Sequence, residues 1–315
     1  MEPFVTKLKS CDFDEMSAAM QGWDQEYRQL QSGPFYGELL ISQIGGLQIS
    51  RGRYERSVLY RGTAPADTVA IAVTLNQRGE GRWLGVQTDT TATIVQKCGA
   101  EGELISPESW EALILSIPTQ EFTRLAGELA ALDPEAVPDL LATVRLTPEA
   151  YSRIRLIGLA YCAHLERSLV HSAAAAMVPQ MARSLVSMLV GELVASWHLR
   201  FEKPDLVRRR QIVRRAEDYI AGCENYPVRI ENICGAIGAS ERSLYYAFAD
   251  AVGMTPLRWL RIQKLHQVRR TLKRADPLET QVTRVAIENG FSHMGHFSQN
   301  YRLLFGETPS ETLRR

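Results

Sequence analysis

The sequence has few cysteines, no long uncharged apolar run and no net charge, and the first two shortages each exclude a class of protein. Its five cysteines are scattered without a C-x-x-C pair, and their odd number fits poorly with a disulfide framework. The most apolar stretch, residues 170–197, is interrupted by charged and polar side chains, so it offers no run of about 18 uncharged residues to span a bilayer. The first ten residues lack the apolar core of a signal peptide. We therefore expect a reduced, cytoplasmic protein with no membrane partner.

The signatures of several common enzymes are also missing. There is no G-x-S-x-G, no P-loop and no dinucleotide-binding G-x-G-x-x-G. The histidines of the middle of the chain are spread out and form no catalytic constellation. His293 and His296 are close in sequence, but no third metal-ligating residue is evident near them. We expect no enzyme activity, no catalytic residues, no cofactor and no metal.

The zero net charge hides a division of charge along the chain. Residues 208–315 contain 18 Lys and Arg against 11 Asp and Glu, a net charge of +7, which leaves −7 for residues 1–207. A basic last third beside an acidic remainder is typical of a nucleic-acid-binding module joined to a module that does not bind nucleic acid. Charge alone leaves open that the asymmetry is accidental.

Residues 35–117 contain short runs of Val, Ile, Leu, Thr and Tyr bounded by glycine turns, a pattern typical of strands. The clearest hairpin joins residues 38–44 to residues 47–51 through Gly45 and Gly46, because glycine supplies the positive φ angles of a two-residue turn. Further strands are expected at residues 58–60, 69–75, 91–95 and 113–117. Strands at this spacing favour a small barrel or a sandwich.

After Pro118 the pattern becomes helical, first at residues 119–132 and 135–144, then as two long helices within residues 148–198. Apolar residues recur along the two long helices at spacings of three and four, so each has a face to bury. This predicted stripe comprises Leu156, Leu159, Ala160, Ala163, Leu165 and Leu169, then Met181, Leu185, Met188, Leu189, Leu193 and Trp197. The stripe packs on the strand domain, forms a homodimer interface, or does both. Residues 202–205 then make a plausible hinge, since Pro204 cannot continue a helix.

One pattern occurs twice in the basic third. A short helix at residues 230–237, Gly238, Ser240 and a helix at residues 241–250 form the first copy; residues 282–289, Gly290, Ser292 and residues 293–305 form the second. Glycine tolerates the left-handed backbone that ends a helix, and a serine hydroxyl caps the first amides of the next helix. The pattern predicts two helix-turn-helix units, whose second helices enter the major groove of double-stranded DNA.

Two further helices accompany these units. Residues 208–222 carry an arginine cluster, and residues 256–272 predict a helix that joins the two units. Its apolar stripe is expected to comprise Leu257, Leu260, Leu265, Val268 and Leu272. A helix of about 18 residues is roughly 27 Å long, comparable to the 34 Å between successive major grooves on one face of DNA. One chain is therefore expected to occupy two adjacent major grooves.

The second unit contains VTRVAIENGFS at residues 282–292, followed by Phe297, Tyr301, Phe305-Gly306 and Thr308-Pro309. With these residues, the whole last third resembles the DNA-binding domain of the AraC/XylS family of transcription regulators. The resemblance implies sequence-specific binding near a promoter and activation by contact with RNA polymerase. Tyr246 and Gln299 stand where members of the family often carry a basic residue.

The solvent-facing side chains of the second helices are the expected DNA contacts. Arg242 is the strongest candidate to read a base, since arginine bonds guanine through two hydrogen bonds. Gln299 either reads adenine or bonds a phosphate. The expected DNA-binding residues are Ser240, Glu241, Arg242, Tyr245, Tyr246, Ser292, His293, Met294, His296, Gln299 and Arg302, with phosphate contacts from Arg209, Arg210, Arg258, Arg261 and Arg269.

The N-terminal part contains WDQEY at residues 23–27, QL at residues 29–30 and GPFYGE at residues 33–38. These segments are similar to the sensor domain of the ethanolamine-utilisation-regulator type of AraC-like proteins. The likeness covers roughly residues 20–118 and implies a cupin-like effector domain, with no particular effector.

Six arginines lie within residues 51–82 of this otherwise acidic part, and guanidinium groups suit phosphate and carboxylate. Residues 78–82 also form the R-x-x-x-R of PilZ-type cyclic-di-GMP receptors. The expected effector-binding residues are Arg51, Arg53, Arg78, Arg82 and Trp83, for an anionic effector such as a cyclic dinucleotide. The alternative is that these arginines are ordinary charged side chains of the strands and bind no effector. Trp23, Trp83 and Trp110 could also line an apolar pocket.

Together these patterns predict an α+β protein with three parts. They are a cupin-like β-barrel or sandwich over residues 1–118, a helical dimerisation segment over residues 119–204 and an all-α domain with two helix-turn-helix units over residues 205–315. The expected function is that of a homodimeric, AraC-type transcription activator controlled by a small-molecule effector. The alternative is control by a protein partner. A sizeable enclosed pocket would favour the first, and a filled core with an exposed apolar patch the second.

Overall fold

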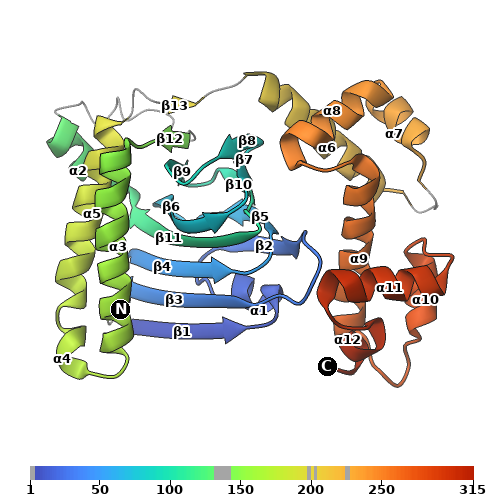
Figure 1. Ribbon diagram of the computed structural model, residues 1–315, viewed down its shortest axis with the longest axis horizontal. Helices are drawn as coiled ribbons and strands as arrows, with labels where there is room; N and C mark the ends of the chain where they lie inside the picture. Colours follow the sequence, from blue (N-terminus) through green and yellow to red (C-terminus); the bar gives the residue numbers. More distant parts are fainter. Residues whose placement is uncertain (1–3, 131–142, 197–199, 202–203, 224–227) are drawn as a thin grey trace. The chain divides into compact units, whose positions relative to one another are not determined.

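The computed structural model describes residues 4–130, 143–196, 200–201, 204–223 and 228–315, and the chain divides into two compact units (Figure 1). The first unit comprises Met1–Tyr27, Tyr36–Trp83 and Gln87–Glu202. The second comprises Arg28–Phe35, Leu84–Val86 and Lys203–Arg315. The helices that follow Pro118 therefore belong to the same unit as the strands.

The larger sheet of the first unit has the strand order β1-β3-β4-β11-β6-β9-β12-β13, with antiparallel neighbours. Its strands are β1 (Phe4–Ser10), β3 (Gly37–Ile44), β4 (Leu47–Tyr54), β6 (Thr68–Arg78), β9 (Ala92–Gln96), β11 (Ser109–Pro118), β12 (Thr143–Arg145) and β13 (Arg200–Phe201). Gly45 takes a φ of 59° in the turn between β3 and β4, where Ile44 pairs with Leu47. The predicted hairpin is thus confirmed, because a left-handed residue is needed at that turn.

The smaller sheet has the strand order β2-β5-β10-β7-β8. Its strands are β2 (Asp24–Gln29), β5 (Val58–Thr63), β7 (Gly81–Trp83), β8 (Val86–Thr88) and β10 (Glu101–Ile105). A short helix, α1 (Phe13–Ala18), precedes β2, and Asp12 caps it. Neither strand order returns to its first strand in the described part of the chain, so the sandwich form of the prediction is confirmed and the closed barrel is wrong.

Helices cover the larger sheet with one continuous core. They are α2 (Thr119–Ala130), α3 (Pro148–Ser168), α4 (Ser172–Ala175) and α5 (Val178–Ala195). The Cβ position of Gly158 on α3 lies 3.1 Å from a Leu113 methyl group of β11, and the Tyr161 hydroxyl lies 2.8 Å from the Ser42 hydroxyl of β3. The segment Ala173–Ala195 is long and apolar enough to cross a membrane by composition, yet Leu185 and Leu189 are fully buried in this core.

The predicted stripe faces the core on α5, whereas on α3 only Leu165 of that stripe is buried. Leu185, Leu189 and Leu193 are buried as expected, whereas Leu156 is 69% exposed and Ala160 and Ala163 are also exposed. The core face of α3 instead presents Ala150, Ile154, Gly158, Tyr161, Cys162 and Leu165. Small residues lie on this face because the helix approaches the sheet closely at Gly158. An apolar strip of α3 is therefore left on the surface of the unit.

The helix predicted at residues 135–144 is wrong at its C-terminal end. Of residues 135–144, only residues 143 and 144 lie among the described residues, and both belong to strand β12. Val144 is fully buried and pairs with Thr93 of β9. Its β-branched side chain packs in the core of the sheet, so pairing with a distant strand overrides the local helical pattern. Trp197, the last residue of the apolar stripe predicted for the second long helix, lies outside the described residues.

The second unit is helical apart from its two short N-terminal segments. Its helices are α6 (Pro204–Ala221), α7 (Ile230–Ile237), α8 (Glu241–Val252), α9 (Pro256–Arg274), α10 (Val282–Glu288), α11 (Met294–Phe305) and α12 (Pro309–Arg314). Trp259 of α9 is fully buried, with its ring 6.5 Å from that of Phe248, and it donates a hydrogen bond to Glu217 of α6 at 2.7 Å. These contacts tie α6, α8 and α9 together.

Candidate DNA-binding interface and ligand pocket

The first helix-turn-helix is formed by α7 and α8. Gly238 ends α7 with a φ of 64°, the left-handed conformation that glycine adopts without strain. Ser240 lies in extended backbone, and its hydroxyl accepts a hydrogen bond from the Ser243 amide at 3.2 Å. Both features confirm the turn and the cap predicted from the sequence.

Helix α8 buries one face and leaves the other in solvent. Leu244 and Phe248 are buried, whereas all four predicted contact residues on this helix are exposed. These are Glu241, Arg242, Tyr245 and Tyr246. The Arg242 guanidinium carbon lies 5.4 Å from the centre of the Tyr246 ring, a cation–π contact across one helical turn. The exposed face thus presents a positioned arginine at the start of the helix.

The second helix-turn-helix is formed by α10 and α11, and its start differs from the prediction. Gly290 has a φ of 82°, as the turn requires. The residue before the helix is His293, in extended backbone and without a side-chain cap, so α11 begins at Met294. The prediction that Ser292 caps the helix is therefore wrong by one residue, because the backbone enters the helix one position later.

On α11 the buried residues are Phe297, Tyr301, Leu304 and Phe305. The residues predicted to contact DNA lie on the other side of the helix or at its start: Ser292, His293, His296, Gln299 and Arg302 are exposed and Met294 is half-buried. The rings of His293 and His296 are 6.3 Å apart, and among the described residues no cluster of three metal-ligating side chains occurs. The structure therefore brings these predicted contact residues together.

Helix α9 joins the two helix-turn-helix units, and most of its predicted apolar stripe is buried. Leu260, Leu265, Val268 and Leu272 face the core, but Leu257 is 51% exposed. Trp259 takes its place, because its large ring fills the space beside Phe248. Arg258 and Arg261 lie on the exposed side of α9, as expected for phosphate contacts.

The other predicted phosphate contacts have protein partners. Arg209 forms an ion pair with Asp250 of α8, and the Arg210 side chain is half-buried. Arg269 is only 4% exposed, and its Nε lies 3.3 Å from a Glu307 carboxylate oxygen. Arg269 is therefore a buried structural residue, and the prediction that it contacts phosphate is wrong.

Comparisons with known proteins concern this helical part of the chain. A family model described as a helix-turn-helix domain matches residues 233–315. A probable thc operon regulatory protein of Rhodococcus erythropolis is 40% identical over 103 residues, which cover 33% of this chain and 31% of that protein. A XylDLEGF operon transcriptional activator of Pseudomonas putida is 38% identical over 88 residues, covering 28% of this chain and 27% of that protein.

A solved structure of a probable AraC family transcriptional regulator from Rhodopseudomonas palustris is 37% identical, covers 33% of this chain and 96% of that chain, and has a TM-score of 0.30. Residues 233–315 form an AraC-type helix-turn-helix domain. The chain spans about a third of the length of the curated relatives that it matches.

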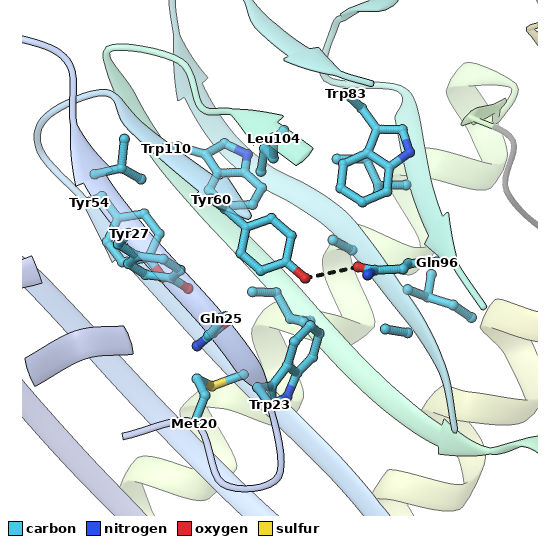
Figure 2. A pocket seen from close by; sticks show the side chains of 16 residues that line it. Met20, Trp23, Gln25, Tyr27, Tyr54, Tyr60, Trp83, Gln96, Leu104 and Trp110 are labelled. Carbon is cyan, nitrogen blue, oxygen red and sulfur yellow. Dashed lines mark hydrogen bonds between the residues drawn. The ribbon is translucent and has the colours of Figure 1, made fainter. Parts of the chain in front are cut away.

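The first unit holds a pocket between its two sheets (Figure 2). Tyr27, Tyr60 and Trp83 come from the smaller sheet, and Tyr54 and Trp110 from the larger. The free space among the lining side chains is about 50 Å³, so the pocket is not the sizeable one that would by itself favour a small-molecule effector over a protein partner. Met20 and Trp23, from the loop that follows α1, complete the aromatic wall. All three tryptophans singled out in the sequence line the pocket.

Most polar atoms of this pocket are already hydrogen-bonded. The Tyr60 hydroxyl donates to Gln96 at 2.9 Å, and the hydroxyls of Tyr27 and Tyr54 are 3.0 Å apart. Trp23 donates to Gln48 and Trp110 donates to Thr74, both at 3.0 Å. The indole Nε1 of Trp83 is the exception: it is buried and has no hydrogen-bond partner among the described residues.

Burial also keeps the tyrosines of the pocket neutral. Loss of hydration raises the pKa of Tyr54 to about 12. The same cause raises the pKa of Tyr27 and of Tyr60 well above the usual value for a phenol. These hydroxyls therefore act as neutral hydrogen-bonding groups at every pH at which the protein works.

The four arginines predicted to bind an effector do not line the pocket. Arg51 lies 2.8 Å from a Glu166 carboxylate oxygen, with Glu38 and Glu111 also within ion-pair distance. Arg53 and Arg78 lie beside Glu55 and Glu108, respectively, and Arg82 lies on β7. The expected anionic effector site stays a prediction, whereas Trp83 joins a different, aromatic site.

Proposed function

We propose that this chain is a transcription regulator that binds specific DNA through both helix-turn-helix units and responds to a small molecule held in its first unit. The observation that carries the proposal is the pair of exposed second helices, α8 and α11, connected through α9. Helix α9 has 19 residues, or about 28 Å at 1.5 Å per residue. This length, against about 34 Å between major grooves on one face of DNA, supports one chain reaching two adjacent grooves.

The test is selection of DNA from a random pool by the full chain, followed by footprinting of the enriched sequences. We expect one enriched sequence family and protection of two adjacent major grooves on one face of the duplex. Enrichment of no sequence over the random pool would contradict specific binding. Protection of a single groove would contradict the proposal that the second helix-turn-helix also binds DNA.

The regulator is an activator that acts in the cytoplasm through contact with RNA polymerase. The support is the likeness of the AraC-type domain to a protein named as an operon transcriptional activator. Transcription in vitro from a promoter placed beside the selected DNA site tests this role. A fall in transcript on addition of the protein would make it a repressor instead.

The exposed strip of α3 supports a homodimer. Leu156 is 69% exposed, Ala160 and Ala163 are exposed beside it, and Leu159 is half-buried. An apolar strip of this kind is stabilised when a second surface covers it. Sedimentation of the full chain should show a dimer that Leu156→Glu converts to monomer. A monomer in the unmodified protein would favour the alternative, in which a different protein partner covers α3 and sets the activity.

A further inference from the structure

The aromatic pocket differs in charge from the surface around it. Its lining side chains are aromatic, aliphatic, amide or thioether groups, and no charged side chain is among them. Several arginines of the same unit are engaged with carboxylates elsewhere, as Arg51 is with Glu166. An unpaired carboxylate or phosphate transferred into such a site would lose its hydration without gaining a counter-charge. The pocket therefore disfavours anions.

The shape of the walls favours a flat molecule. The rings of Tyr60 and Trp83 are inclined by only 18°, with centroids 6.5 Å apart, and Trp23 meets Tyr60 edge-on at 6.2 Å. Figure 2 shows these rings and Trp110 on the walls around the Tyr60 hydroxyl and Gln96. Planar apolar molecules gain dispersion and ring–ring contacts on such walls.

One polar group on the wall remains to be satisfied. Trp83 is 2% exposed, and its Nε1–H has no partner among the residues that the structure describes. A buried donor left unpaired is unfavourable, so a ligand that reaches it when the wall moves, and that brings an acceptor to it, gains affinity. Trp23 and Trp110, in contrast, already donate to Gln48 and Thr74. The unpaired donor favours a ligand with a neutral acceptor such as a carbonyl oxygen.

The size of the free space limits the ligand. About 50 Å³ is free, and one water occupies about 30 Å³ of liquid. A single aromatic ring therefore needs some of the wall to move. Met20 and the half-buried Trp23 lie on the loop after α1, and methionine adapts readily to different shapes. The entry of a small ring by displacement of this loop is compatible with the packing.

We propose that this pocket binds a small, planar, uncharged aromatic molecule with a neutral hydrogen-bond acceptor, and that it excludes anions. The inference rests on the proposed ligand-responsive function and names the class of its effector. It replaces an anionic effector held by the arginines with an uncharged one held by aromatic rings.

The test compares three probes of similar size, benzamide, benzoate and toluene, on the full chain. Tryptophan fluorescence and thermal unfolding report binding, because Trp23, Trp83 and Trp110 all line the pocket. We expect benzamide to raise the unfolding temperature in a dose-dependent way, and benzoate to need at least about tenfold higher concentration. Toluene should bind more weakly than benzamide, and Trp83→Phe should lower benzamide affinity by roughly tenfold and erase its advantage over toluene.

Two variants distinguish binding of benzamide in the pocket from binding elsewhere on the protein. Ala72→Leu adds three carbons to a pocket-lining residue and should abolish the benzamide response, whereas Ala66→Leu adds the same atoms at an exposed position of the same unit and should not. Tighter binding of benzoate than of benzamide, lost in Arg78→Gln, would overturn the proposal in favour of an arginine site. A benzamide response that survives Ala72→Leu, or no response to any probe, would also overturn it.

DNA binding is measured on the same preparations, so that the two proposals fail separately. Specific DNA binding without any ligand response refutes the effector class and leaves the DNA-binding function standing. A benzamide response without specific DNA binding refutes the proposed function and leaves the pocket assignment standing.

Discussion

Arg242 and Tyr246 form a cation–π pair on the exposed face of α8, with the guanidinium carbon 5.4 Å from the ring centre. Tyr246 is 54% exposed, and it stands one helical turn after Arg242. The ring therefore limits the orientations of a side chain that would otherwise be free in solvent. A tyrosine at this position supports the arginine beside it instead of supplying a charge of its own.

The first prediction concerns base reading by this pair. Arg242→Ala should weaken binding to the selected DNA site by about 1–3 kcal/mol and relax the preference at one base pair. Tyr246→Phe keeps the ring and should change specificity little, whereas Tyr246→Leu should weaken the same preference by about 0.5–1 kcal/mol. Binding is measured by fluorescence anisotropy on specific and random duplexes. Equal losses on both duplexes for Arg242→Ala would show a phosphate contact only.

The second prediction separates two arginines of α9. Arg261 is exposed, so Arg261→Ala should weaken binding to all DNA sequences alike and lower the salt slope by about 1, with unchanged stability. Arg269 is buried against Glu307, so Arg269→Ala should destabilise the fold by about 2–4 kcal/mol by leaving a buried carboxylate poorly paired. Urea unfolding and salt titrations distinguish the two effects. Equal stability of both variants would refute the structural role of Arg269.

The third prediction uses two glycines of the first helix-turn-helix. Gly238 has a φ of 64°, so Gly238→Ala should cost about 1–2 kcal/mol of stability. Gly235 lies within α7, and a Cβ there would meet nothing within 4 Å. Gly235→Ala should therefore stabilise the protein by about 0.5–1 kcal/mol. Thermal unfolding of the two variants should show shifts of opposite sign, and shifts of the same sign would contradict the assigned turn.

The fourth prediction is a pH dependence that arises from His266. Burial lowers the pKa of this ring from 6.5 to about 3, and its Nε2 lies 2.7 Å from the Gln29 carbonyl oxygen, to which the neutral ring donates. The unfolded chain takes up the proton below pH 6.5, but the folded chain does not until about pH 3. The free energy of unfolding should therefore fall by up to about 1.4 kcal/mol per pH unit below pH 6.5.

A substitution isolates this contribution from those of the carboxylates. His266→Gln keeps a side-chain donor and removes the titrating ring. Urea unfolding at pH 7 and pH 5 should show a smaller loss of stability in His266→Gln than in the unmodified chain. The same loss in both proteins would exclude His266 as the source.

The helix-turn-helix units could be predicted from the sequence because their signals are local. Gly238, Ser240 and the period of Leu244 and Phe248 all lie within about 11 residues, and each acts through its own backbone or its own helix face. The predicted start of α11 is one residue too early, because serine at position 292 is a preferred N-cap residue whereas the structure has His293 at the cap position. Leu257 was assigned to the core because periodicity does not distinguish it from Trp259, whose burial depends on Phe248 and Glu217.

Several features of the first unit could not be predicted from local sequence patterns. Periodicity predicts an apolar stripe on α3, but the side of that helix that meets the sheet is decided by the close approach of Gly158 to Leu113. The six arginines suggested an anion site because sequence shows their number and not their carboxylate partners. Tyr54 and Tyr60 were not singled out for the pocket, since nothing near them in the chain marks them as its walls.

The sequence by itself determined the DNA-binding architecture and the strand-then-helix order of the chain, because turns, caps and helical periods are set by residues close together. The tertiary structure alone decided the aromatic pocket, in which Tyr27 and Tyr54 bring their hydroxyls to 3.0 Å from different sheets. Only the packing of two sheets brings such residues together and removes the water around them. The proposed preference of the pocket for an uncharged ligand rests on this exclusion of water and charge.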